Sequence, residues 1–267
     1  MNYRKYNNSQ SPKIIGVFLL SFLLISMISI GQDRDIYQIK IYNLESDQQE
    51  QRMDKFLKDA FIPALDRAGI KNVGVLKPNE QNEIVSNQIY VLIPFKSISQ
   101  FEKLEGILLK DKTYQADGSD YIDAAHDNPP YARTESILLR AFKSMTNYGV
   151  PTHSTPSSEQ VYELRSYQGA TEKLYQKKVE MFTDAGESQI FVDLGFQPVF
   201  FGEVISGSTM PNLMYLTTFK NKKSQDEHWD AFRTAPAWLK LKVDKQYDNT
   251  VSKNVKLYLQ PTGYSGL

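Results

Sequence analysis

The chain reads IYQIKIY at residues 36–42 and VYELRSY at residues 161–167, and these two stretches decide the fold. In each, aliphatic or aromatic residues alternate with polar ones. The polar residues match in character, since Gln38 corresponds to Glu163 and Lys40 to Arg165. Alternation with a period of two is typical of a strand that buries one face. A strand that recurs so far along one chain indicates an internal duplication.

An amphipathic helix is expected after each of these strands. The first ends at Gly69 and contains Pro63, which predicts a kink or break; its apolar face is Met53, Phe56, Leu57, Ala60, Phe61, Ala64, Leu65 and Ala68. The second ends at Gly195, and its apolar stripe is Leu174, Met181, Phe182, Ala185 and Val192. Both stripes have the spacing of one buried helical face.

Further strands complete each half. Residues 72–77 pair with 88–95, residues 198–205 pair with 213–219, and the last strands are 135–142 and 255–260. The dipeptides Phe95-Lys96 and Phe219-Lys220 each end a strand and open a second helix. Corresponding positions are offset by about 120 to 126 residues. The order βαββαβ in each half predicts an α+β chain of two tandem ferredoxin-like modules.

The predicted domains are residues 32–142 and 159–267, and residues 143–158 are rich in Ser, Thr and Pro, as a linker is. The first half also has an additional segment, residues 112–131, which contains Tyr114, Tyr121 and His126. A surface loop is the preferred interpretation of this segment, and a lid over a pocket is the alternative.

The N-terminus has the pattern of an export signal. Arg4, Lys5 and Lys13 lie before or at the start of an apolar run, residues 14–30, and the small residue Gly31 follows. We expect a secretory signal peptide over residues 1–31, and hence a periplasmic or secreted protein. An uncleaved helix that anchors the protein to a membrane is the alternative.

The composition excludes several classes of function. Lys plus Arg and Asp plus Glu both total 31, so nothing supports a nucleic-acid partner. There is no cysteine for a thiolate, a disulfide or cysteine-ligated zinc, and the three histidines, His126, His153 and His228, lack ligand spacing. We therefore expect neither a metal nor a cofactor.

The second half resembles the NIPSNAP family. The resemblance covers residues 159–265 and rests on YELRSY (162–167), MPNLMYLTTF (210–219), HWDAF (228–232) with Pro236 and Trp238, and QPTGYS (260–265). It is weaker over residues 35–142, where Leu104 and Glu105 replace the His-Trp pair. The resemblance implies a dimeric α/β-barrel in which two ferredoxin-like sheets meet face to face with helices outside. Two modules in one chain would form this barrel as a pseudo-dimer, so a monomer is sufficient.

The same alternation predicts where chemistry would occur. If helices cover the apolar face of each sheet, the polar face points into the space between the sheets. Lys40 and Tyr42, beside Gln38, and then Glu163, Arg165 and Tyr167 would line this inter-sheet cavity. Such a cavity suits a small anionic or amphipathic ligand or a protein partner. The alternative is that Glu163 and Arg165 only pair with each other.

His228 is the weak candidate for a catalytic residue. It lies on the second helix of its half, where it would be a general base in a cofactor-free oxygenase or isomerase. A second role is haem ligation by His228 or His126. A third interpretation is that His228 simply packs at the edge of a helix. Proteins that share only the implied architecture include cofactor-free monooxygenases and haem enzymes, so whether this chain is an enzyme stays open.

Overall fold

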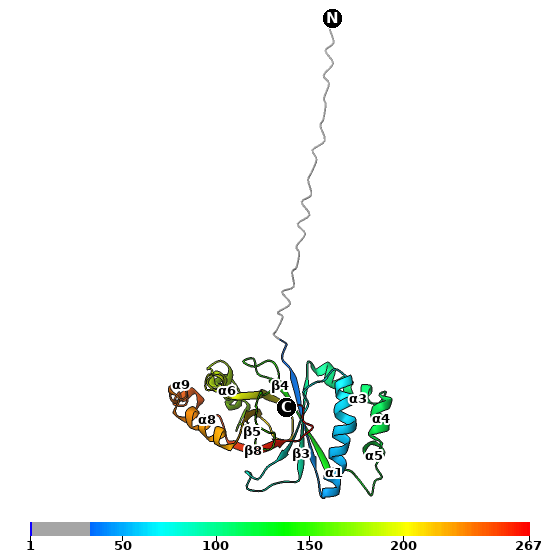
Figure 1. The fold of residues 1–267 in the computed structure, drawn as a ribbon. Coiled ribbons are helices and arrows are strands. Elements are labelled where there is room, and N and C mark those ends of the chain that lie inside the picture. Colours follow the sequence, from blue (N-terminus) through cyan, green and yellow to red (C-terminus); the bar gives the residue numbers. More distant parts are fainter. Residues whose placement is uncertain (2–32) are drawn as a thin grey trace. The chain divides into compact units, whose positions relative to one another are not determined.

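Eight antiparallel strands close into a barrel in the computed structural model, which describes Met1 and residues 33–267 (Figure 1). The predicted signal peptide or anchor, residues 1–31, lies outside the described residues apart from Met1. Of the helices in residues 33–267, none has the length and apolarity that crossing a bilayer requires.

The strands follow one order in both halves of the chain. Around the barrel the order is β1-β3-β2-β8-β5-β7-β6-β4, so each half has its strands in the order fourth, first, third, second. The halves join where β2 pairs with β8 and where β4 pairs with β6. This is an α+β fold with an eight-stranded antiparallel barrel, as expected. The strands are β1 (Ile36–Asn43), β2 (Gly74–Pro78), β3 (Gln88–Phe95), β4 (Arg133–Ala141), β5 (Val161–Gln168), β6 (Gln197–Ser206), β7 (Asn212–Phe219) and β8 (Lys253–Pro261).

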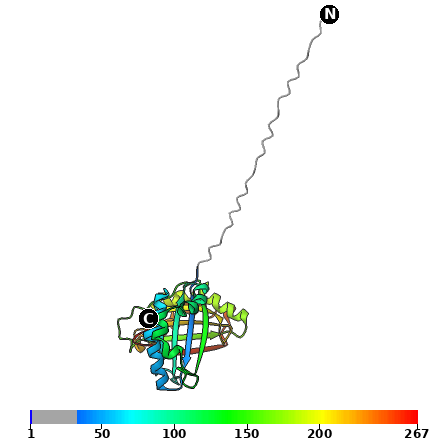
Figure 2. The ribbon, with the colours of Figure 1, turned by 90° about the vertical axis from the view of Figure 1, so that its right-hand side faces the viewer.

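The helices lie on the outside of the barrel (Figure 2). In the first half, the predicted helix consists of α1 (Asp47–Phe56), a π-helical turn η1 (Leu57–Phe61) and α2 (Ile62–Arg67). The widened turn comes just before Pro63, because a proline ring crowds the carbonyl four residues earlier and donates no hydrogen bond. Gly69 has a φ of 78°, as predicted for a left-handed C-terminal position.

The remaining helices of the first half correct one expectation. After α3 (Ile98–Leu108), residues 112–131 form the short helices α4 (Lys112–Asp117) and α5 (Ser119–Ile122). The preferred interpretation of this segment as a surface loop is therefore wrong. Its Tyr114 is buried and packs into the helix-covered core of the first half.

The second half contains α6 (Glu172–Thr183), α7 (Glu187–Asp193), α8 (Lys222–Thr234), α9 (Pro236–Leu241) and the 3-10 turn η2 (Lys245–Tyr247). A single helix from Leu174 to Val192 was expected, and this is wrong. Gly186, at a φ of 86°, separates α6 from α7. The break changes the helical phase, so Val192 is 53% exposed while Phe191 is buried. The expected stop at Gly195 is confirmed by its φ of 79°.

The barrel interior is filled by apolar side chains, which corrects the expected polar cavity. From β1 and β5 it receives Tyr37, Ile39, Tyr162 and Leu164. A closed interior has no access to water, so unpaired polar groups would be costly there. The polar residues alternate with these and therefore face the helices. The residues affected by this correction are Gln38, Lys40, Tyr42, Glu163, Arg165 and Tyr167.

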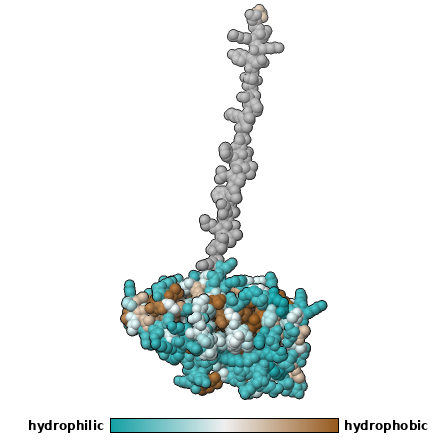
Figure 3. Space-filling model, in the orientation of Figure 1, coloured by the Kyte–Doolittle hydropathy of each residue, from teal (hydrophilic) through white to brown (hydrophobic). Residues whose placement is uncertain are grey.

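The predicted linker packs against the rest of the structure. Tyr148 is in ring contact with Tyr37 at 5.7 Å between centroids, and the backbone carbonyl of Thr146 accepts from the amide of Asp35 at 2.9 Å. Residues 33–267 accordingly behave as one unit. The face shown in Figure 3 is mostly hydrophilic with scattered apolar patches, which agrees with large apolar side chains being mainly inside.

Candidate functional site

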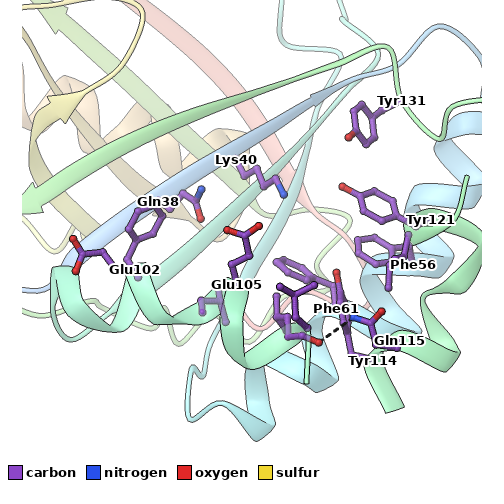
Figure 4. A pocket seen from close by; sticks show the side chains of 15 residues that line it. Gln38, Lys40, Phe56, Phe61, Glu102, Glu105, Tyr114, Gln115, Tyr121 and Tyr131 are labelled. Carbon is purple, nitrogen blue, oxygen red and sulfur yellow. Dashed lines mark hydrogen bonds between the residues drawn. The ribbon is translucent and has the colours of Figure 1, made fainter. Parts of the chain in front are cut away.

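A pocket lies between β1 and the helices of the first half (Figure 4). It has a volume of about 570 Å³, in the range of small-molecule sites. Its lining combines aromatic and aliphatic side chains with a few polar ones: Gln38, Lys40, Phe56, Phe61, Phe101, Glu102, Leu104, Glu105, Leu108, Leu109, Tyr114, Gln115, Tyr121, Ile122 and Tyr131.

Lys40 is the cation of this pocket. Its ammonium lies 5.0 Å from the ring centroid of Tyr42 and 5.7 Å from that of Phe61. Within residues 33–267 it forms no ion pair and no hydrogen bond, and burial lowers its pKa. The aromatic faces compensate only part of the lost hydration. The pocket therefore presents a positive charge that has no protein carboxylate as its partner.

Aromatic rings form one wall of the pocket. Phe56 stacks on Tyr121 with centroids 3.7 Å apart, and Tyr42 packs edge-on against Tyr131 at 5.5 Å. The hydroxyl of Tyr42 is buried without a hydrogen-bond partner, and burial raises the pKa of Tyr42. Because Tyr114, Tyr121 and Tyr131 all come from residues 112–131, this segment covers the pocket as a lid would.

In the second half, the corresponding polar side chains satisfy one another. Glu163 is fully buried; its Oε1 accepts from Nε of Arg165 at 2.6 Å and forms an ion pair with Nη2 of Arg165 at 2.5 Å. Its Oε2 accepts from Nε2 of Gln225 at 2.7 Å and from Nε1 of Trp229 at 2.6 Å. The guanidinium carbon of Arg165 lies 3.7 Å from the ring centroid of Trp229. The alternative in which Glu163 and Arg165 pair with each other is thus what the structure shows.

A smaller cavity of about 380 Å³ lies beside this network. Lys178 and Glu187 line it, and they form a buried ion pair at 2.7 Å. Burial raises the pKa of Glu187, while the charge of Lys178 opposes this rise. Tyr167, which also lines the cavity, exchanges a hydrogen bond of 2.8 Å with Tyr215. Its charged groups are mostly paired internally, so it presents less free charge than the first pocket.

The structure thus divides the predicted site residues between two places. Lys40 and Tyr42 lie together in the first half, and Glu163, Arg165 and Tyr167 lie together in the second. These residues could be identified in the sequence because they alternate with apolar residues along a strand. Phe56 and Phe61 were missed as pocket lining, because apolar helix residues are more often simply core. Tyr121 was named only through the alternative that residues 112–131 form a lid.

His228 packs at a helix edge. Its Nδ1 lies 2.6 Å from the carbonyl oxygen of Ser224, its Nε2 lies 3.3 Å from that of Gly195, and its ring meets Phe196 at 5.2 Å between centroids. It is not among the residues that line either cavity. His126 is exposed. In the described part of the chain, no group of three or more His, Asp or Glu could hold a metal ion.

Comparison with known proteins supports the family resemblance for the second half. Residues 162–266 match the NIPSNAP family model. No curated protein matches the chain in sequence.

Solved structures share the fold. One is a "putative monooxygenase" from Lactobacillus acidophilus NCFM, at 11% identity and a TM-score of 0.56, covering 85% of this chain and 94% of that one. Another, from Fusobacterium nucleatum subsp. nucleatum and described in the same words, has 10% identity and a TM-score of 0.54, with 86% and 93% covered. An anthrone oxidase-like protein has 11% identity and a TM-score of 0.50, with 86% and 92% covered. At such identities the likeness concerns the fold alone, and it confirms the α/β-barrel arrangement.

Proposed function

We propose that this protein binds a small amphipathic anion in the pocket of the first half, with its negative group at Lys40. One observation carries the proposal: an ammonium without a carboxylate partner lies inside a pocket of about 570 Å³ that is otherwise largely apolar and aromatic. A bound anion would supply the missing charge, and in a low-dielectric pocket this attraction is stronger than in water. The aromatic wall would bury the apolar part of the ligand.

The chain as a whole is proposed to be a pseudo-dimer of tandem ferredoxin-like modules, residues 32–142 and 159–267, connected by residues 143–158. The strand order repeated in each half supports this. We further propose that the protein is exported by a signal peptide over residues 1–31, on the basis of the basic and apolar N-terminus. If the N-terminal segment is not cleaved, the alternative is a protein anchored to the membrane. If the pocket binds no small molecule, the alternative is a protein partner.

A second candidate function is a cofactor-free oxygenase or isomerase that works in this pocket rather than inside the barrel. The specific observation in its favour is that burial lowers the pKa of Lys40, since an amine of lowered pKa can accept a proton from a bound substrate. Haem binding by His228 or His126 stays a prediction, which the appearance of a Soret band on haem titration would test.

The binding proposal is tested with 8-anilinonaphthalene-1-sulfonate, an aromatic anion whose fluorescence rises in apolar surroundings. We expect Lys40→Met to weaken its binding at least tenfold. Lys58→Met, which removes an exposed lysine from η1, should leave binding unchanged. Equal affinity of the Lys40→Met variant and the unmodified protein would overturn the proposal, provided that circular dichroism shows both to be folded.

Two further measurements identify ligand and reaction. Mass spectrometry of small molecules carried by the purified protein would show a natural ligand directly. An oxygen electrode with added anthrone tests the second candidate, because an oxygenase should consume oxygen and Lys40→Met should not. If the ligand binds tightly but no oxygen is consumed and the ligand is chemically unchanged, only the binding function is supported.

A further inference from the structure

The two halves have different side chains at equivalent positions. Strands β1 and β5 hold the same place in the sheet order, with Lys40 where the second half has Arg165. Next to the cation, Gln38 stands where the second half has Glu163. On the second helix of each half, Glu105 of α3 corresponds to Trp229 of α8. The first half therefore has the cation but lacks both the carboxylate and the indole.

In the second half, the missing groups are present and act as one unit. The Glu163 carboxylate binds the guanidinium of Arg165, and the Trp229 indole both covers that guanidinium and donates to the carboxylate. Gln225 adds a third hydrogen-bond donor to Glu163. Carboxylate and aromatic ring together thus neutralise and cover a buried cation, which is the arrangement such a charge requires.

In the first half, no described residue forms an ion pair with Lys40, although the rings of Tyr42 and Phe61 face its ammonium at 5.0 and 5.7 Å. Nε2 of Gln38 donates to Oγ of Ser136 on β4 at 2.8 Å, so this amide is engaged with a neighbouring strand. Glu105 is exposed and forms no ion pair with Lys40. In Figure 4 the Glu105 side chain extends from α3 toward Lys40 of β1, with the aromatic rings to one side. Glu105 lines the cavity of the first half, as Trp229 lines the smaller cavity of the second.

We infer that the ligand of the first half is a small aryl carboxylate, an aromatic ring with a carboxylate on a short tether, and that Glu163 and Trp229 occupy the equivalent position in the second half. This inference rests on the proposed function, and it specifies the ligand class and one ligand per chain. The ligand carboxylate takes the place of the Glu163 carboxylate, and its ring takes the place of the indole. Phe56, Phe61 and Tyr121 supply the aromatic surroundings.

The rim of the pocket limits the charge of the ligand. Glu102 and Glu105 line it and are both solvent-exposed. Their negative charges are screened by water, so they oppose a single carboxylate only weakly. A second negative group on the ligand would add to this repulsion, whereas Lys40 supplies only one positive charge. The rim thus favours monoanions.

The test is isothermal titration with three probes: indole-3-acetate has both ring and carboxylate, hexanoate has only the carboxylate, and 3-methylindole has only the ring. We expect indole-3-acetate to bind with a stoichiometry of one and at least tenfold more tightly than either other probe. Gln38→Glu should weaken it at least tenfold, because the new carboxylate would pair with Lys40 as Glu163 pairs with Arg165. Gln51→Glu, an exposed substitution on α1, is the matched charge control and should change nothing.

A second variant keeps the test decisive if Gln38→Glu does not fold. Glu105→Trp changes an exposed residue and places an indole where the second half has Trp229, so it should also weaken indole-3-acetate at least tenfold. Unchanged affinity in a folded variant contradicts the inference.

The outcomes separate the two proposals. If hexanoate binds as tightly as indole-3-acetate and depends on Lys40, the ligand class is wrong while the anion site stands. Two ligands per chain would show that Glu163 and Trp229 do not occupy the second position. If none of the probes, nor the naphthalenesulfonate, depends on Lys40, the proposed function itself fails.

Discussion

Replacing Glu163 by glutamine should expose how strongly the buried network holds the second half together. Glu163 is fully buried, accepts three hydrogen bonds and is ion-paired with Arg165, which is only 9% exposed. Glutamine keeps the shape but removes the charge, so the guanidinium remains buried without compensation. Breaking a buried pair in this way costs about 3–5 kcal/mol. At about 2–4 °C per kcal/mol for a domain of this size, the melting temperature should fall by roughly 6–20 °C.

The assay is urea unfolding followed by circular dichroism, applied to a double-mutant cycle. Arg165→Met should be similarly destabilising, and the double variant should cost less than the sum of the two by about 0.5–3 kcal/mol. Asp226→Asn, which breaks the exposed pair with Lys222, is the control and should cost less than about 1 kcal/mol. A cost for Glu163→Gln no larger than the control, or two additive costs, would refute the reasoning.

Three other perturbations have expected outcomes. Lys40→Met should stabilise the protein at pH 7, because burial lowers the pKa of Lys40 and its charged form therefore destabilises the folded state. The stability gained by Lys40→Met should shrink as the pH rises through the lowered pKa of Lys40 in the folded state, and it should disappear near the pKa of about 10.4 in the unfolded chain. If the urea midpoints of variant and unmodified protein differ equally at pH 7 and above about pH 10.4, the prediction is contradicted. Leu216→Ala, inside the barrel, should cost about 2–5 kcal/mol in the same unfolding assay, and a negligible cost would argue for a hollow interior. Gly186→Ala should lower the free energy of unfolding by about 1–2 kcal/mol, because the φ of 86° is strained for alanine, although an added Cβ meets no atom within 4 Å. An unchanged free energy of unfolding would mean that the backbone relaxes there.

Local patterns in the sequence were enough for most of the secondary structure. The alternation over residues 36–42 and 161–167 located β1 and β5, and Gly69 and Gly195 marked helix ends that the φ angles confirm. Each of these signals depends only on neighbours along the chain, either a side-chain period or a residue that tolerates a left-handed backbone. The polar positions Lys40 and Arg165 were likewise visible as members of one strand face.

Signals that depend on distant residues were misread. The break at Gly186 escaped because the apolar residues on either side of it fit one helical stripe. Residues 112–131 looked like a loop because their tyrosines have partners, such as Phe56, only in the folded chain. The sequence prediction pointed the polar faces of β1 and β5 to the interior, whereas the structure places them under the helices. Alternation shows that a strand has two different faces, but what covers each face depends on distant residues.

The sequence by itself determined the strands, the helix ends, the repeated βαββαβ order and the matched polar positions, because these follow from local periodicity and backbone preference. Only the tertiary structure decided that the barrel interior takes the apolar face and the helix layers take the polar one. A closed barrel admits neither water nor a charged partner, whereas a helix can bring Trp229 and Gln225 to Glu163. In the first half, α3 brings Glu105 rather than an indole to the pocket, and Lys40 forms no ion pair within residues 33–267.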